Sequence, residues 1–110
     1  MILLDSTASA EGPALTGEKA AGDGAYGARD GDHTVAYFVN NFVGVIEIQA
    51  TLAADPLEED WFSIPATQYG DGSTILNTPV YRTFVGNFSW VRVKVSQFSS
   101  GAINKIGYQR

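Results

Sequence analysis

The 110-residue chain contains no cysteine, and it lacks long apolar runs. Without cysteine it cannot form a disulfide scaffold or a cysteine-ligated zinc finger or ribbon, and its redox compartment cannot be inferred. No apolar run approaches the ~20 residues that a membrane span requires, and the apolar start of the chain is too short for the core of a signal peptide. We therefore expect one soluble domain that is not exported by a classical signal and has no membrane partner.

Charge is also scarce, because Asp, Glu, Lys and Arg make up 17% of the residues, and the formal net charge is −5. All 12 acidic residues lie within residues 1–71, whereas residues 72–110 contain five basic residues and no acid. Either the fold interleaves the two parts and neutralises their charges locally, or the acidic part of one copy docks on the basic part of the next. We expect no nucleic-acid partner, because the basic residues are scattered and the net charge repels phosphate.

Large apolar residues are rare before residue 34, where six Gly and seven Ala occur instead. Such a segment buries too little apolar surface to offset its ordering entropy. We predict an extended N-terminal arm over residues 1–33, anchored by Ile2, Leu3 and Leu4, and a folded domain over residues 34–110. Three alternatives remain for the arm: a frayed terminus, a docking arm on a neighbouring subunit, or a first strand of the same sheet.

From residue 34 onward, β-branched and aromatic residues alternate with polar ones, as is typical of β-strands. We expect strands over residues 34–39 and 42–52, joined by a two-residue turn at Asn40 and Asn41. One face of the second strand is apolar and should cover the core. This face consists of Ile46, Ile48, Ala50 and Leu52.

Four acids within residues 55–60 interrupt the strand pattern. A proline follows Asp55, and Glu58 lies three residues after it, which is the form of a helix start. The sequence therefore predicts a single helical turn or a tight loop there. A short strand over residues 61–64 should follow and end at Pro65.

The strongest local signal is the Gly86–Asn87 pair between the strand-like residues 81–85 and 88–98. Gly followed by Asn fits a two-residue hairpin turn, and cross-strand pairing would then bring aromatic side chains beside a cation. One face of this hairpin would carry Tyr81, Phe88, Trp90 and Arg92. The opposite face, which should cover the core, would carry Phe84, Val91, Val93 and Val95.

A second turn at residues 99–101 and a last strand over residues 102–108 complete the predicted sheet. Short strands separated by Gly, Asn and Ser, with no convincing helix, favour an all-β fold. The expected architecture is an antiparallel β-sandwich or jelly-roll-like domain with an extended N-terminal arm.

Signals for catalysis and metal binding are weak. His33 has no marked nucleophile and acid to complete a triad. The acids near residues 30–33 and 55–60 do not match the spacing of a calcium loop, and no glycine-rich phosphate loop follows a strand. We predict no enzyme, no cofactor and no metal site. The aromatic and basic set Tyr81, Phe88, Trp90 and Arg92 suits contact with a subunit or partner, or with a sugar ring.

Four short sequence segments within the expected strands and their flanks resemble segments of a known group of proteins. They are residues 45–52 (VIEIQATL), 60–64 (DWFSI), 86–98 (GNFSWVRVKVSQF) and 101–107 (GAINKIG). Together they are similar to small virion structural proteins of tailed bacteriophages, closest to those of marine cyanophages. The resemblance spans about residues 35 to 108, leaves out the arm, and rests on these segments rather than on catalytic residues.

The resemblance implies a β-sandwich present in many copies on the virion, as a capsid decoration protein or a tail or fibre accessory. It implies no enzymatic activity and no cofactor. The expected partners are copies of the chain itself, with a trimer as the first expectation, and other virion proteins. Assembly would use Ile2, Leu3 and Leu4 together with Tyr81, Phe88, Trp90 and Arg92. The alternative is a carbohydrate-binding module that recognises host-surface glycan through the same aromatic residues.

Overall fold

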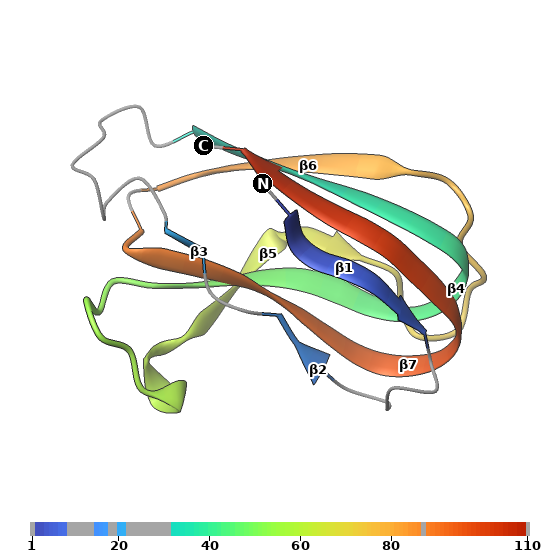
Figure 1. The fold of residues 1–110 in the computed structure, drawn as a ribbon, viewed down its shortest axis with the longest axis horizontal. Helices are drawn as coiled ribbons and strands as arrows, with labels where there is room; N and C mark the ends of the chain where they lie inside the picture. Colours follow the sequence, from blue (N-terminus) through green and yellow to red (C-terminus); the bar gives the residue numbers. More distant parts are fainter. Residues whose placement is uncertain (1, 9–14, 18–19, 22–31, 87, 110) are drawn as a thin grey trace.

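The computed structural model describes residues 2–8, 15–17, 20–21, 32–86 and 88–109, and all structural statements below concern these residues. Two long strands dominate the fold, β4 (Asp32–Thr51) and β7 (Trp90–Gln109), with 20 residues each. They pair antiparallel from Thr34 opposite Gln109 to Thr51 opposite Trp90. Figure 1 shows that this two-stranded ribbon bends back on itself, so that each strand has an upper and a lower half.

The bend lies where both strands depart from regular β geometry. Asn41 and Gln97 each have a φ angle of 52°, and Gly101 has a φ angle of 83°. The pairing of β4 with β7 also shifts register between Asn40 and Val43. Such bulges bend a strand and increase its twist. A Cβ atom at Gly101 would overlap the carbonyl oxygen of Asn41, so the two backbones approach here more closely than a side chain permits.

The bend encloses the apolar core between the upper and lower halves of the ribbon. In β4 the residues buried before the bend have odd numbers, whereas most of those buried after it have even numbers. The irregular residues at the bend reverse the face on which each side chain lies, and this keeps apolar residues inside on both halves. The core comprises Val35, Tyr37, Val39, Phe42, Ile46, Ile48, Ala50, Phe84, Val91, Val93, Val95, Phe98, Ile103, Ile106 and Tyr108.

The two apolar faces predicted from the sequence are confirmed as core faces, with one exception. The confirmed residues are Ile46, Ile48, Ala50, Phe84, Val91, Val93 and Val95. Leu52 is 67% exposed, because β4 ends one residue earlier and the chain leaves the sheet.

The outer edge of β7 pairs with three short segments near the start of the chain. These are β1 (Ile2–Ala8), β2 (Leu15–Thr16) and β3 (Ala20–Ala21). They follow β7 in order from Gly107 to Trp90, always antiparallel, so they form an interrupted third strand of the ribbon.

The described segments of the predicted arm are thus strands of the same sheet, which was one of the three alternatives for it. The division of the chain at residue 33 stays a prediction. So does the anchoring role of Ile2, Leu3 and Leu4, whose backbone lies in β1 but whose side chains lie outside the described part of the structure.

The outer edge of β4 pairs with β5 (Phe62–Tyr69) along its lower half and with β6 (Val80–Val85) along its upper half. The expectation that the first of these strands ends at Pro65 is wrong, since β5 continues through it. Among the described residues β5 lies at an edge of the sheet, and an edge tolerates the missing N–H of proline. The expected single helical turn is present as the 3-10 helix η3 (Glu58–Asp60), but the start expected at Asp55 is wrong, because the N-cap is Leu57 and its N–H is bound by Asp60.

The predicted hairpin between residues 81–85 and 88–98 is wrong. β6 pairs with the upper half of β4, where Thr83 lies opposite Thr34, whereas β7 begins against the lower half, with Trp90 opposite Thr51. Both strands therefore pair with the long strand β4 and not with each other, although the local turn signal predicts a hairpin. Asn87, the second residue of that predicted turn, lies outside the described residues.

The all-β class is confirmed, and the strands are joined antiparallel. The more specific sandwich or jelly-roll arrangement is not, because within the described residues all seven strands belong to one hydrogen-bonded sheet. No helix in this part of the chain is long and apolar enough to span a membrane.

Candidate functional site

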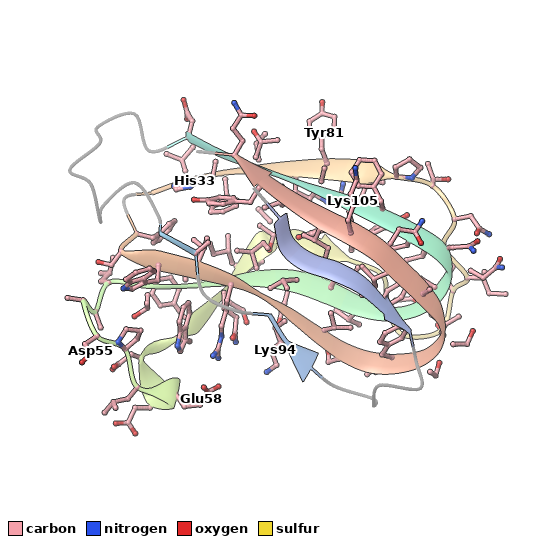
Figure 2. All side chains as sticks on the ribbon, viewed as in Figure 1. His33, Asp55, Glu58, Tyr81, Lys94 and Lys105 are labelled. Atoms are coloured by element: carbon pink, nitrogen blue, oxygen red, sulfur yellow. The ribbon has the colours of Figure 1, made fainter. Side chains whose placement is uncertain are left out.

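The predicted aromatic and basic set is divided between two sides of the molecule. Tyr81 lies on β6 and is 69% exposed. Arg92 lies on the lower half of β7, where it binds Glu58. Figure 2 shows Tyr81 and Glu58 on opposite sides of the structure. The expectation of one shared face is therefore wrong, because it depended on the hairpin that does not form.

Arg92 is held within the chain by three groups. Its Nε donates a hydrogen bond of 2.8 Å to Oε1 of Gln49, and its two terminal nitrogens donate bonds of 2.6 and 3.1 Å to the carboxylate of Glu58. The guanidinium lies over the ring of Trp61, 4.3 Å from its centroid. Trp61 thus takes the stacking position that the sequence assigned to Tyr81. The bonds from Arg92 lower the pKa of Glu58.

Trp90 and Phe88 also make contacts within the chain. The indole Nε1 of Trp90 donates a 2.9 Å hydrogen bond to the carbonyl oxygen of Ala54. The ring of Phe88 packs beside the core, with its centroid 5.6 Å from that of His33 and 5.9 Å from that of Phe62. These two aromatic residues therefore connect the segment after β4 to the body of the fold.

The segment that follows β4 contacts the lower half of β7 through Trp90 and Arg92. Together with Phe62, the first residue of β5, it carries a distinctive surface, which we call the apolar–acidic loop (residues 52–62). Figure 1 shows it projecting from one end of the sheet. Its exposed apolar side chains are Leu52 at 67%, Leu57 at 64% and Phe62 at 43%. The exposed acids among them are Asp55, Glu58, Glu59 and Asp60. Exposed large apolar side chains grouped beside charge are typical of contact surfaces.

The outer surface of the upper half carries a depression of about 320 Å³, which we call the upper depression. Ala36 and Gly107 lie opposite each other at its middle. It is lined by Thr34, Ala36, Phe38, Lys105, Gly107, Tyr108 and Gln109. The ammonium of Lys105 lies 4.9 Å from the ring centroid of Phe38. Tyr81 pairs with Ala36 from the neighbouring strand and therefore lies on the same surface.

His33, the single histidine of the chain, is a core residue with 1% exposure. Its Nε2 lies 2.7 Å from the carbonyl oxygen of Gly86, and its Nδ1 lies 2.7 Å from the hydroxyl of Tyr108. Because a carbonyl only accepts, Nε2 donates to it, and in the neutral ring Nδ1 then accepts from the tyrosine hydroxyl. The ring also stacks on Phe84 at a centroid distance of 4.6 Å. These contacts give His33 a structural role.

Metal ligands do not gather in the described part of the chain, where no group of three or more His, Asp and Glu side chains is placed to hold an ion. Two features of the surfaces were missed by the sequence analysis. The position of Trp61 directly after the acids marks it as a candidate contact residue, but it does not reveal that its ring stacks on Arg92. The small residues Ala36 and Gly107 within strands were a usable signal, because a small residue on an outward face leaves space above it.

Comparison of the chain with models of protein families, with curated proteins and with solved structures gave no match.

Proposed function

We propose that this chain is a non-enzymatic structural module of a bacteriophage virion, present in several copies as a capsid decoration protein or a tail or fibre accessory. The similarity of four of its sequence segments to small virion proteins of tailed phages supports this proposal, and so does its all-β fold. The observation that carries the proposal is the apolar–acidic loop, which presents exposed Leu52, Leu57 and Phe62 on a fixed framework.

The framework of this loop is set by hydrogen bonds from β7 and the residue before it. Trp90 donates to Ala54, Ser89 Oγ donates to the carbonyl oxygen of Leu52 at 3.0 Å, and Arg92 binds Glu58. A loop that is already ordered loses less conformational entropy on association. The partner surface should therefore meet a preformed shape.

The loop also suits a partner with basic and apolar groups, because its apolar side chains are surrounded by acids. The chain itself supplies a half-exposed cation at Lys94 on β7. The proposed partners are thus further copies of the chain, in a symmetric homo-oligomer, or neighbouring virion proteins.

Immunogold labelling of purified virions, with an antibody raised against this chain, tests the proposal. Label on the shell supports a capsid decoration protein, and label on the tail supports a tail or fibre accessory. Absence of label, together with absence of the chain from the mass spectrum of the virion, would overturn the proposal.

A double substitution in the apolar–acidic loop tests the surface itself. Leu52→Asp with Leu57→Asp should abolish self-association or reduce it at least tenfold, because it places two more carboxylates in an apolar contact. Sedimentation velocity measures the change. Ile75→Asp is the matched control, since Ile75 is also 64% exposed but lies in a different loop. Equal loss of association in both variants would show that charge, and not this surface, is responsible.

A further inference from the structure

The upper depression has the dimensions of a site for a single sugar ring. Three cross-strand rows of outward-facing residues form it: Thr34 with Gln109, Ala36 with Gly107, and Phe38 with Lys105. Alternate residues of a strand are about 6.6 Å apart, so the two outer rows stand about 13 Å apart across the small middle row. The space between them, of about 320 Å³, lies at the small end of the range for ligand pockets.

The lining of the depression matches the chemistry of a pyranose. A sugar ring has an apolar face of C–H groups and a rim of hydroxyl groups. The half-exposed Phe38 and the exposed Tyr81 offer aromatic surface for the first, and the exposed Thr34, Gln109 and Lys105 offer hydrogen-bonding groups for the second. Because the floor at Ala36 and Gly107 is nearly all backbone, a flat ring can approach it closely.

The net negative charge of the molecule favours neutral sugars over anionic ones. The chain carries a net charge of −5, which repels anionic polysaccharides at long range. Among the described residues that line the depression, Lys105 is the one cation, and its ammonium already lies over Phe38. A neutral hexose is therefore a better fit than a uronic or sialic acid.

We propose that the upper depression binds the neutral pyranose unit of a surface glycan, with Tyr81 and Phe38 against the ring and with Thr34, Lys105 and Gln109 on its hydroxyl groups. This site is separate from the apolar–acidic loop, which lies on the opposite side of the molecule (Figure 2). One surface would thus attach the module to the particle and the other would contact the host. It replaces the predicted set of Tyr81, Phe88, Trp90 and Arg92, of which Tyr81 lies on the same surface, opposite Ala36 of the lining.

Titration of the isotope-labelled full chain with methyl glucoside, methyl galactoside and N-acetylglucosamine, followed by amide chemical shifts, tests the site. A ligand of this size should bind with a Kd on the order of 1 mM, which the method detects. At least one neutral sugar should shift the amide signals of Ala36 and Gly107. Tyr81→Ala should weaken this binding at least fivefold, and Ala36→Leu should abolish it by filling the floor.

Val85→Ala is the matched control, because Val85 is exposed on the same strand, four residues from Tyr81, but pairs with Asp32, which is not part of the lining. It should leave binding unchanged. Three results would overturn the proposal: no shifts with any neutral sugar, shifts with glucuronate alone, or a concentration-dependent shift of this surface without sugar, which would make it a contact between copies. The titration needs no virion, so its failure is distinguishable from failure of the assembly proposal.

Discussion

At the scale of single residues, a buried threonine compensates for an irregularity in the sheet. The pairing of β4 with β5 shifts register between Ile46 and Ile48. There the Oγ1 of Thr67, a residue with 0% exposure, accepts a 2.9 Å hydrogen bond from the N–H of Ile48 and donates one of 2.6 Å to the carbonyl oxygen of Ile64. The hydroxyl thus replaces backbone hydrogen bonds that the shifted ladder does not make.

Replacing Thr67 by Val keeps the shape of the side chain but removes both hydrogen bonds. The buried N–H of Ile48 then loses its acceptor, which should lower the free energy of unfolding by about 1–3 kcal/mol. Urea denaturation measures the loss. Thr83→Val, at an exposed position of β6, is the control and should change stability by less than about 0.5 kcal/mol. Equal effects at the two positions would contradict the assigned role.

Gly101 is the residue on which the bend of the ribbon depends most. Its φ angle of 83° disfavours any residue with a Cβ, and such a Cβ would also overlap the carbonyl oxygen of Asn41. Gly101→Ala should therefore cost more than the about 1–3 kcal/mol expected from backbone conformation alone. Thermal unfolding followed by circular dichroism checks this, with the neighbouring exposed Ser99→Ala as the control. A variant as stable as the parent would mean that the two strands can separate at the bend.

At the scale of elements, the apolar–acidic loop is connected to the sheet by a contact that depends on pH. The folded-state pKa of Glu58 lies below its ordinary value of 4.5, so the contact contributes stability above about pH 4.5 and loses it as the pH falls through the lower folded-state pKa. Glu58→Gln removes this dependence. The parent should be the more stable of the two at pH 7, and the difference should be smaller at pH 2, where more of the Glu58 carboxylate is protonated. Denaturation at both pH values measures it, and a difference that stays the same in acid would contradict the assignment.

The strands were largely predictable from the sequence, but their connections were not. Alternation with a period of two identified the core faces of the lower half of the ribbon, because one-sided burial imposes it. The turns expected at residues 40–41 and 99–101 are wrong, because β4 and β7 each continue through these positions as one bent strand. Local sequence does not distinguish a hairpin turn from a bend inside a long strand, and these two segments lie opposite each other at one bend, with Asn40 paired to Ala102.

The candidate surfaces were less predictable than the strands. Exposure of Tyr81 fits its predicted role in contact, whereas Phe88, Trp90 and Arg92 are occupied within the chain. Their partners, such as Trp61 and Ala54, come from the loop after β4, which the topology places over the lower half of the ribbon. That contact depends on the pairing of strands distant in the sequence, so neither composition nor spacing reveals it.

At the scale of the whole molecule, the first strands complete a three-stranded ribbon. β1, β2 and β3 together follow the outer edge of β7, from Gly107 to Trp90. Within the described part of the chain these three segments are what pairs with that edge. An uncovered strand edge is a template for pairing with other chains.

Removal of residues 1–21 should therefore expose the outer edge of β7. We expect lower thermal stability and an increase in aggregation, because unpaired N–H and C=O groups along the edge would recruit other molecules. Static light scattering and amide hydrogen exchange of β7 measure the two effects, against the full chain at equal concentration. A truncated protein that stays monomeric with unchanged protection would show that the edge is protected in another way.

The pairing of β4 with β7 also has a consequence for how the protein is made. His33 and Tyr108, which share a hydrogen bond, are 75 positions apart, and the pairs of the central ribbon range from Thr34 with Gln109 to Thr51 with Trp90, all distant in the sequence. A growing chain therefore contains all of β4 before the synthesis of β7 begins. Loops of this length close slowly, which places folding in the range of milliseconds to seconds. During synthesis, one long apolar strand lacks its partner, and its exposed apolar surface and unpaired edges favour aggregation over that interval.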